Sequence, residues 1–145
     1  MWRKPKRRTT LVKLWIAAPN DGTPPLYAFL DTLEEKQRQK IFSLLALLLQ
    51  TPATAMREPY VKHFGIERYR TLYELRAKSR NLVRITFTLR ENGDILFLIP
   101  FIKRRRRDTM QALDASLHLL AQCRDGSCSI QELSIKSYIN GGNAT

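Results

Sequence analysis

The sequence predicts a protein of the α+β class, in which helices pack against a sheet of mostly antiparallel strands. Three observations lead there. Apolar residues recur at helical spacing over residues 26–50, alternate with polar residues between 72 and 90, and return to helical spacing after residue 108. The expected order is β-α-α-β-β-β-α. This order implies an antiparallel or mixed four-stranded sheet, two N-terminal helices packed on one face, and a C-terminal helix.

The first half of the chain is expected to hold one strand and two helices. Alternation predicts a strand over residues 10–16, and the Pro-rich segment 18–25 is typical of a loop. Apolar spacing predicts a short helix over 26–33 and a second one from about Thr32 to Gln50, stopped by Thr51-Pro52. The second helix has more leucines than one buried face requires. They suit the core, and a partner-binding face is the alternative.

The second half is expected to form a meander of three strands and a final helix. Alternation covers residues 72–78 and 82–90, and the Asn92-Gly93 pair indicates a hairpin turn. A nearly continuous apolar strand follows over 95–102. Asp108 or Thr109 is expected to cap the last helix. Its apolar stripe would consist of Met110, Leu113, Leu117 and Leu120.

One domain over residues 10–122 is expected, with a basic arm at 1–9 and a polar tail at 123–145. The longest apolar run, residues 44–49, is far shorter than the roughly 20 residues of a spanning helix, and the basic N-terminus lacks the apolar stretch of a signal peptide. We therefore expect a cytoplasmic protein without a membrane partner. Cys123 and Cys128 are too few to close a tetrahedral metal site; reduced thiols are expected, with a small-loop disulfide as the alternative in an oxidising compartment. No metal or cofactor is expected.

Positive charge is concentrated in one third of the chain. Lys and Arg number 25 against 13 acidic residues, a net charge of +12. Residues 57–107 contain 14 Lys or Arg and 5 Asp or Glu, so 14 minus 5, or +9, lies there. Such an excess favours binding to a polyanion, because each neutralised phosphate releases counterions.

The pleat of the predicted strands places basic side chains on one face. If residues such as Leu75 and Ile85 face the helices, then Arg76 and Arg84 project from the other side. Lys78 shares that side, and the run 103–107, five consecutive basic residues, follows the next strand. The expected result is an open cationic surface, with a merely solvated patch as the alternative.

Other catalytic patterns are weak in this sequence. The six glycines do not have the spacing of a phosphate-binding loop. His63 lies among apolar residues, where a packed role is expected, and His118 is expected on a solvated helix surface one turn from Asp114. No Ser/His/Asp or paired-carboxylate arrangement is convincing.

Five segments occur along the chain in a fixed order, namely Pro25-Leu-Tyr-Ala-Phe-Leu-Asp-Thr-Leu33, Arg57-Glu-Pro-Tyr-Val-Lys-His-Phe64, Leu72-Tyr-Glu-Leu-Arg76, Val83-Arg-Ile-Thr-Phe87 and Phe101-Ile-Lys103. Their residues and their order resemble the phage-derived HigB-like toxins of the RelE/ParE superfamily. The resemblance spans residues 11–122. It implies a RelE-like fold and cleavage of mRNA, usually on the ribosome. It also implies a partner antitoxin, often a helix-turn-helix protein.

The resemblance also assigns residues. It implies that the catalytic groups are Arg76, Arg84 and Lys103 or its neighbour Arg104. RelE-type enzymes often have a tyrosine in the last helix that stacks on a base, whereas this chain has Met110 near that position. Base stacking must therefore come from another residue or be weaker. Further basic residues are expected to bind RNA, namely Lys62, Lys78, Arg80, Arg105, Arg106 and Arg107. The implied enzyme is a metal-independent endoribonuclease, in which the ribose 2′-oxygen attacks the phosphorus and the two arginines stabilise the developing charge.

Two other functions remain open. A non-enzymatic inhibitor of DNA gyrase, as in the ParE branch, would keep the fold and the charge but cut no RNA. A plain RNA-binding module would be tolerated on overexpression. Replacing Arg84 by alanine is expected to abolish growth inhibition while leaving the protein folded.

Overall fold

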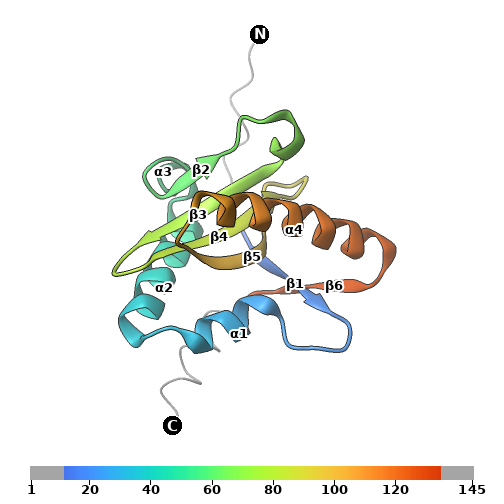
Figure 1. Ribbon diagram of the computed structural model, residues 1–145, viewed down its shortest axis with the longest axis horizontal. Helices are drawn as coiled ribbons and strands as arrows, with labels where there is room; N and C mark the ends of the chain where they lie inside the picture. Colours follow the sequence, from blue (N-terminus) through green and yellow to red (C-terminus); the bar gives the residue numbers. More distant parts are fainter. Residues whose placement is uncertain (1–11, 135–145) are drawn as a thin grey trace.

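The structure, a computed structural model, describes residues 12–134. Its elements are shown in Figure 1 and follow the order β1 (Leu14–Pro19), α1 (Pro25–Thr32), α2 (Glu35–Gln50), α3 (Pro52–Ala55), β2 (Val61–His63), the 3-10 helix η1 (Glu67–Tyr69), β3 (Leu72–Lys78), β4 (Leu82–Leu89), β5 (Ile95–Lys103), α4 (Arg106–Asp125) and β6 (Cys128–Glu132). The α+β class is confirmed. The expected basic arm, residues 1–9, lies outside the described residues.

The strands of the described chain form one mixed sheet in the order β2-β3-β4-β5-β1-β6. β1 runs parallel to β5, and the other neighbouring pairs are antiparallel. The predicted meander is β3, β4 and β5. Gly93 adopts a φ of 91° in the turn between β4 and β5, whereas Asn92 does not have a positive φ, so the turn is not the two-residue Asn-Gly type. The backbone N–H of Arg90 donates to the carbonyl of Asp94 at 2.7 Å, which makes this a longer hairpin loop with a left-handed glycine. The sheet therefore has six strands instead of the expected four.

The two additional strands, β2 and β6, lie at the edges of the sheet. β2 has three residues and pairs with β3, and β6 pairs with β1. β6 lies in the segment expected to be a polar tail. The chain reaches it because α4 runs on to Asp125 and Gly126 adopts a φ of 88°, the left-handed conformation that ends many helices.

Helices cover both faces of the sheet. α1 and α2 pack against Leu75, Ile85 and Phe97 on one face, whereas α4 packs against Leu96 and Leu98 on the other. α4 lies across β5 and β4 (Figure 1). The leucine-rich stripe of α2 is core: Ile41, Leu44, Leu45 and Leu48 are buried, and Phe42, Leu47 and Leu49 pack against the same cluster. Among the described helices, none combines the length and the apolar content needed to cross a bilayer.

The last helix begins earlier than expected. α4 starts at Arg106, so Asp108 is its third residue and not its N-cap. The Asp108 carboxylate accepts the backbone N–H groups of Arg104 and Arg105, at 2.9 and 2.8 Å. These two donors precede the helix and have no partner within it, which is why a carboxylate is favourable at this position.

A β-bulge interrupts the pairing of β4 with β5. Ile85 is opposite Pro100 and Phe87 is opposite Phe97, so two steps along β4 correspond to three along β5. Beyond the bulge the side chains of β5 exchange faces. Phe101 and Lys103, which strict alternation would place under α1 and α2, therefore share the face of α4.

A buried chain of hydrogen bonds joins the bulge to α4. The backbone N–H of Ile99 donates to the hydroxyl of Thr86 at 2.9 Å, and Thr86 lies 2.6 Å from the hydroxyl of Ser116. Ser116 donates in turn to the carbonyl of Ala112 at 2.7 Å. Both hydroxyl-bearing residues are fully buried, so this chain fixes the position of α4 over the sheet.

Candidate nucleic-acid interface

Three strands place cationic side chains on the face of the sheet that carries α4. Arg76 of β3 is directly opposite Arg84 of β4, and Arg84 is opposite Phe101 of β5. Two residues further along, Leu82 is opposite Lys103. Because residues directly opposite each other point to the same side, Arg76, Arg84 and Lys103 share one face. The structure thus brings together the three predicted residues of β3, β4 and β5.

This face is less open than expected, because α4 covers part of it. Arg84 is buried, with 8% of its surface exposed, whereas the side chain of Arg76 retains 25%. Lys103 is partly exposed. The cations therefore differ in depth, with Arg84 the least accessible.

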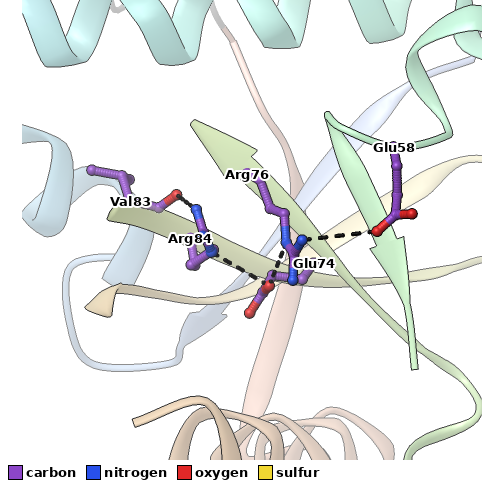
Figure 2. A network of polar contacts seen from close by, with 5 residues as sticks. All are labelled: Glu58, Glu74, Arg76, Val83 and Arg84. Carbon is purple, nitrogen blue, oxygen red and sulfur yellow. Dashed lines mark hydrogen bonds and ion pairs between the residues drawn. The ribbon is translucent and has the colours of Figure 1, made fainter. Parts of the chain in front are cut away.

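A buried carboxylate lies between the two arginines (Figure 2). One oxygen of Glu74, Oε1, is 3.0 Å from Nε of Arg76 and 3.5 Å from Nε of Arg84. Nη1 of Arg76 also lies 3.9 Å from Oε1 of the exposed Glu58. Nη1 of Arg84 donates to the backbone carbonyl of Val83 at 3.3 Å. Arginines directly opposite each other repel. The carboxylate between them offsets that repulsion.

Burial and charge act in opposite directions on Arg84. Removal from water is the main cause that lowers the pKa of its guanidinium, and the neighbouring Arg76 lowers it further. The carboxylate of Glu74 raises this pKa and so favours the charged form. Glu74 itself is fully buried, and its second oxygen, Oε2, has no hydrogen-bond partner among the described residues. A carboxylate so enclosed is suited to holding arginines, not to meeting a substrate.

Of the other predicted RNA-binding residues, Lys62 and Lys78 lie on the same face of the sheet as this pair, whereas Arg80 lies beside the start of α2. Lys62 is opposite Glu74, and its ammonium is 5.5 Å from the centre of the Phe64 ring. Lys78 is opposite Leu82 and exposed, so both lysines belong to the α4 face. Arg80 lies in the turn after β3, 4.0 Å from Glu34.

The basic run after β5 surrounds the start of α4. Arg104 and Arg105 precede the helix, Arg106 and Arg107 form its first turn, and all four are exposed. Cations at a helix N-terminus are electrostatically unfavourable, and here only Asp108 offsets them in the first turn. Arg104, Arg105 and Asp108 line a hollow of about 330 Å³ between β5 and α4.

The two histidines lie apart from the arginines. His63 is opposite Tyr73, stacks on its ring at 4.5 Å between centroids and donates from Nε2 to the carbonyl of Arg70, so it belongs to the other face of the sheet. His118 is exposed on α4. Asp114, one turn before it, accepts the hydroxyl of Tyr69 at 2.6 Å and pairs with Arg68 at 3.3 Å.

Sequence reasoning did not assign a role to Glu74. The signal was present, because the alternation of residues 72–78 places Glu74 on the same side as Arg76 and Lys78. Its burial could not be predicted, since it depends on where α4 crosses the sheet. Tyr60 was also not singled out. Its carbonyl accepts the backbone N–H of Arg76 at 2.8 Å, and 37% of its surface is exposed.

Fold and site together define a small basic α+β protein whose sheet presents a cluster of arginines and lysines on one face. Comparison with protein families gives the particular group. The chain belongs to the family described as Phage derived protein Gp49-like (DUF891), whose model matches residues 28–120, more than half of the chain. This is a toxin-like family of toxin–antitoxin systems. A search of curated proteins finds no match.

Proposed function

We propose that this protein is the toxin of a type II toxin–antitoxin pair and that it cleaves mRNA as an endoribonuclease, with the ribosome helping to present the RNA. The observation that carries the proposal is the direct pairing of Arg76 with Arg84 on a basic sheet face, with Lys103 two residues along on the same side. Membership of a toxin-like family supports it independently.

The reaction that suits these groups needs no metal. The ribose 2′-oxygen attacks the adjacent phosphorus, a 2′,3′-cyclic phosphate forms, and the bond to the 5′-oxygen breaks. Negative charge grows on the phosphoryl oxygens during the attack. Arg76 and Arg84 would stabilise it, an effect of about 2.7–4 kcal/mol for one well-placed donor.

Proton transfer is the weaker part of this site. In this proposal Lys103 would protonate the departing 5′-oxygen, which its partial exposure and its position on the same face as the arginines support. The 2′-proton would pass to solvent water. Much of the rate would then depend on holding the RNA in line, which is the role proposed for the ribosome.

The surrounding cations would bind the flanking RNA. Lys62 and Lys78 lie on the same sheet face as the arginines. Arg105, Arg106 and Arg107 surround the start of α4. The proposed partner that silences this surface is an antitoxin with a helix-turn-helix domain.

The structure changes the choice of test variant. Replacing Arg84 by alanine would remove one of the two cations that compensate the buried Glu74 and so would perturb the fold as well as the site. Arg84→Lys is a cleaner variant, because it keeps a positive charge beside Glu74 and removes only the planar fork that binds two phosphate oxygens. Arg90→Lys, at the opposite end of β4, is the matched control.

The test is induction of each variant in bacteria without the antitoxin, followed by mapping of transcript 5′ ends. We expect discrete new 5′ ends and growth arrest with the native protein and with Arg90→Lys, and strongly reduced cleavage with Arg84→Lys. Intact transcripts with the native protein would overturn the proposal. If DNA damage accompanied them, the gyrase inhibitor would be the better assignment.

A further inference from the structure

The buried carboxylate of Glu74 has a geometry that a simple surface ion pair does not have. Its Oε1 atom lies within 3.5 Å of both arginine Nε atoms, whereas the guanidinium of Arg84 would otherwise be a largely buried charge facing Arg76. Glu74 reaches both because it is two residues before Arg76 on the same strand and face. The single carboxylate of Glu74 therefore orients both guanidinium groups.

We propose that Glu74 is a positioning residue, which holds the guanidinium groups of Arg76 and Arg84 side by side so that both bind the same phosphate group. The inference rests on the proposed function, in that the phosphate is taken to be that of RNA. Glu74 does not act as a base, because both of its oxygens are enclosed and one already contacts the arginines. Its effect on the substrate passes through the two guanidinium groups.

Two unpartnered atoms indicate that this arrangement can tighten. Oε2 of Glu74 and Nε of Arg84 are both buried without a hydrogen-bond partner among the described residues. At 3.5 Å, Nε of Arg84 is within ion-pair distance of Glu74 but does not make a well-directed hydrogen bond. A small approach of Arg84 to the carboxylate would satisfy it. An anion that draws the two guanidinium groups together favours such an approach.

The alternative is a purely structural role. Buried arginine–glutamate clusters can often be replaced by apolar residues of similar volume without loss of stability. In that case Glu74 would matter for folding alone. The two roles differ in what happens to RNA binding and to cleavage, since removing a negative charge from a cationic site does not weaken its attraction for a polyanion.

The experiment compares the full-length native chain with Glu74→Gln and Glu74→Asp. Glu74→Gln keeps the volume and removes the charge, and Glu74→Asp keeps the charge but shortens the reach by one methylene. Glu67→Gln is the matched control, because Glu67 also lies 3.0 Å from an arginine, Arg70, but on the exposed surface. Three quantities are measured: hydrogen exchange of the Arg76 and Arg84 Nε–H groups by NMR, affinity for a 2′-O-methyl RNA that cannot be cleaved, and the single-turnover cleavage rate.

We expect both Glu74 variants to fold. The affinity of Glu74→Gln for the RNA should be at least that of the native chain, and the affinity of Glu74→Asp should lie within about threefold of it. Exchange at the two Nε–H groups should accelerate at least tenfold in Glu74→Gln. Cleavage should fall about 100-fold in both variants, the loss typical of a small displacement of catalytic groups. Glu67→Gln should match the native chain in all three measurements.

Three results would overturn the inference. They are unchanged Nε–H exchange in Glu74→Gln, native cleavage by Glu74→Asp, and a loss of activity fully explained by the unfolded fraction. If Glu74→Gln does not fold, Glu74→Asp decides, because it keeps the negative charge at this position. A native chain that cuts no RNA would instead overturn the proposed function. The exchange measurement would still decide whether Glu74 orders the arginine pair.

Discussion

At the level of single residues, the three proposed catalytic cations of the α4 face, Arg76, Arg84 and Lys103, differ in how far they reach solvent. Lys103 and Arg76 are partly exposed to solvent, whereas Arg84, directly opposite Arg76 on the neighbouring strand, is buried. An incoming RNA strand would therefore contact Lys103 and Arg76 first and Arg84 last. Alternation along the strands predicts that Arg76 and Arg84 share a side. Their depth cannot be predicted from alternation, because it follows from a helix that is distant in sequence.

Asp108 leads to a prediction about pH. The backbone N–H groups of Arg104 and Arg105 are the main cause that lowers the pKa of its carboxyl group below the ordinary value, and nearby arginines lower it further. The ionised form is thus favoured by folding. Its contribution to stability is present above the ordinary carboxyl pKa and is lost as the pH falls through the lowered value.

We expect Asp108→Asn to unfold at lower urea concentration than the native chain at neutral pH. This difference in urea concentration should become smaller at acidic pH, where the Asp108 carboxylate of the native chain is protonated. Urea unfolding of both proteins from pH 7 downward measures it. Asp114→Asn is the control, since the carboxylate of Asp114 accepts the hydroxyl of Tyr69 and no backbone N–H group before the helix. A difference between the native chain and Asp108→Asn that is independent of pH would contradict the capping role.

At the level of elements, the bulge in β5 has the largest consequence for the site. It moves Phe101 and Lys103 to the face of α4, which strict alternation from Ile95 would not do. The apolar run alone does not reveal the bulge, but Pro100 is a signal for it, because a proline cannot donate to the hydrogen-bond ladder and in a central strand is found at bulges. The edge strands β2 and β6 were missed for a different reason. They are short, and they depend on the pairing supplied by β3 and β1.

Thr86 is the residue on which the bulge depends most directly. Thr86→Val keeps the shape of the side chain but removes the acceptor for the Ile99 N–H and the bond to Ser116. A buried donor left without a partner costs about 1–3 kcal/mol, so the free energy of unfolding should fall by that amount. Urea denaturation measures the change. Thr88→Val, which loses one bond to the carbonyl of Thr71 at an exposed site, should cost less. Equal losses in both variants would contradict the role assigned to the bulge.

At the level of the whole molecule, the helices on the two faces of the sheet have different roles. α1 and α2 close the core on one face of the sheet, and the other face combines α4 with the arginine pair and the basic run. Sequence reasoning predicted the helices, the central meander and the side on which the cations lie. It did not predict that α4 shares that side, because the packing face of a helix depends on the sheet as a whole.

This division predicts that the location of charge, and not its total, controls RNA binding. Removing Arg106 and Arg107 together, as Gln variants, takes two charges from the start of α4. Removing Lys36 and Lys40 takes two from the exposed side of α2, in the layer across the sheet. Both double variants have the same net charge. For single-stranded RNA, each lost phosphate contact should reduce the slope of log affinity against log salt by about 0.7.

We therefore expect the slope to decrease by about 1.4 for the Arg106/Arg107 variant and to remain unchanged for the Lys36/Lys40 variant. Fluorescence anisotropy of a labelled 2′-O-methyl RNA at several salt concentrations measures it, since the blocked 2′-oxygen prevents cleavage during the titration. Equal slopes for the two variants would mean that RNA responds to overall charge. The basic face would then be a solvated surface, and the arginine pair on it would need another ligand.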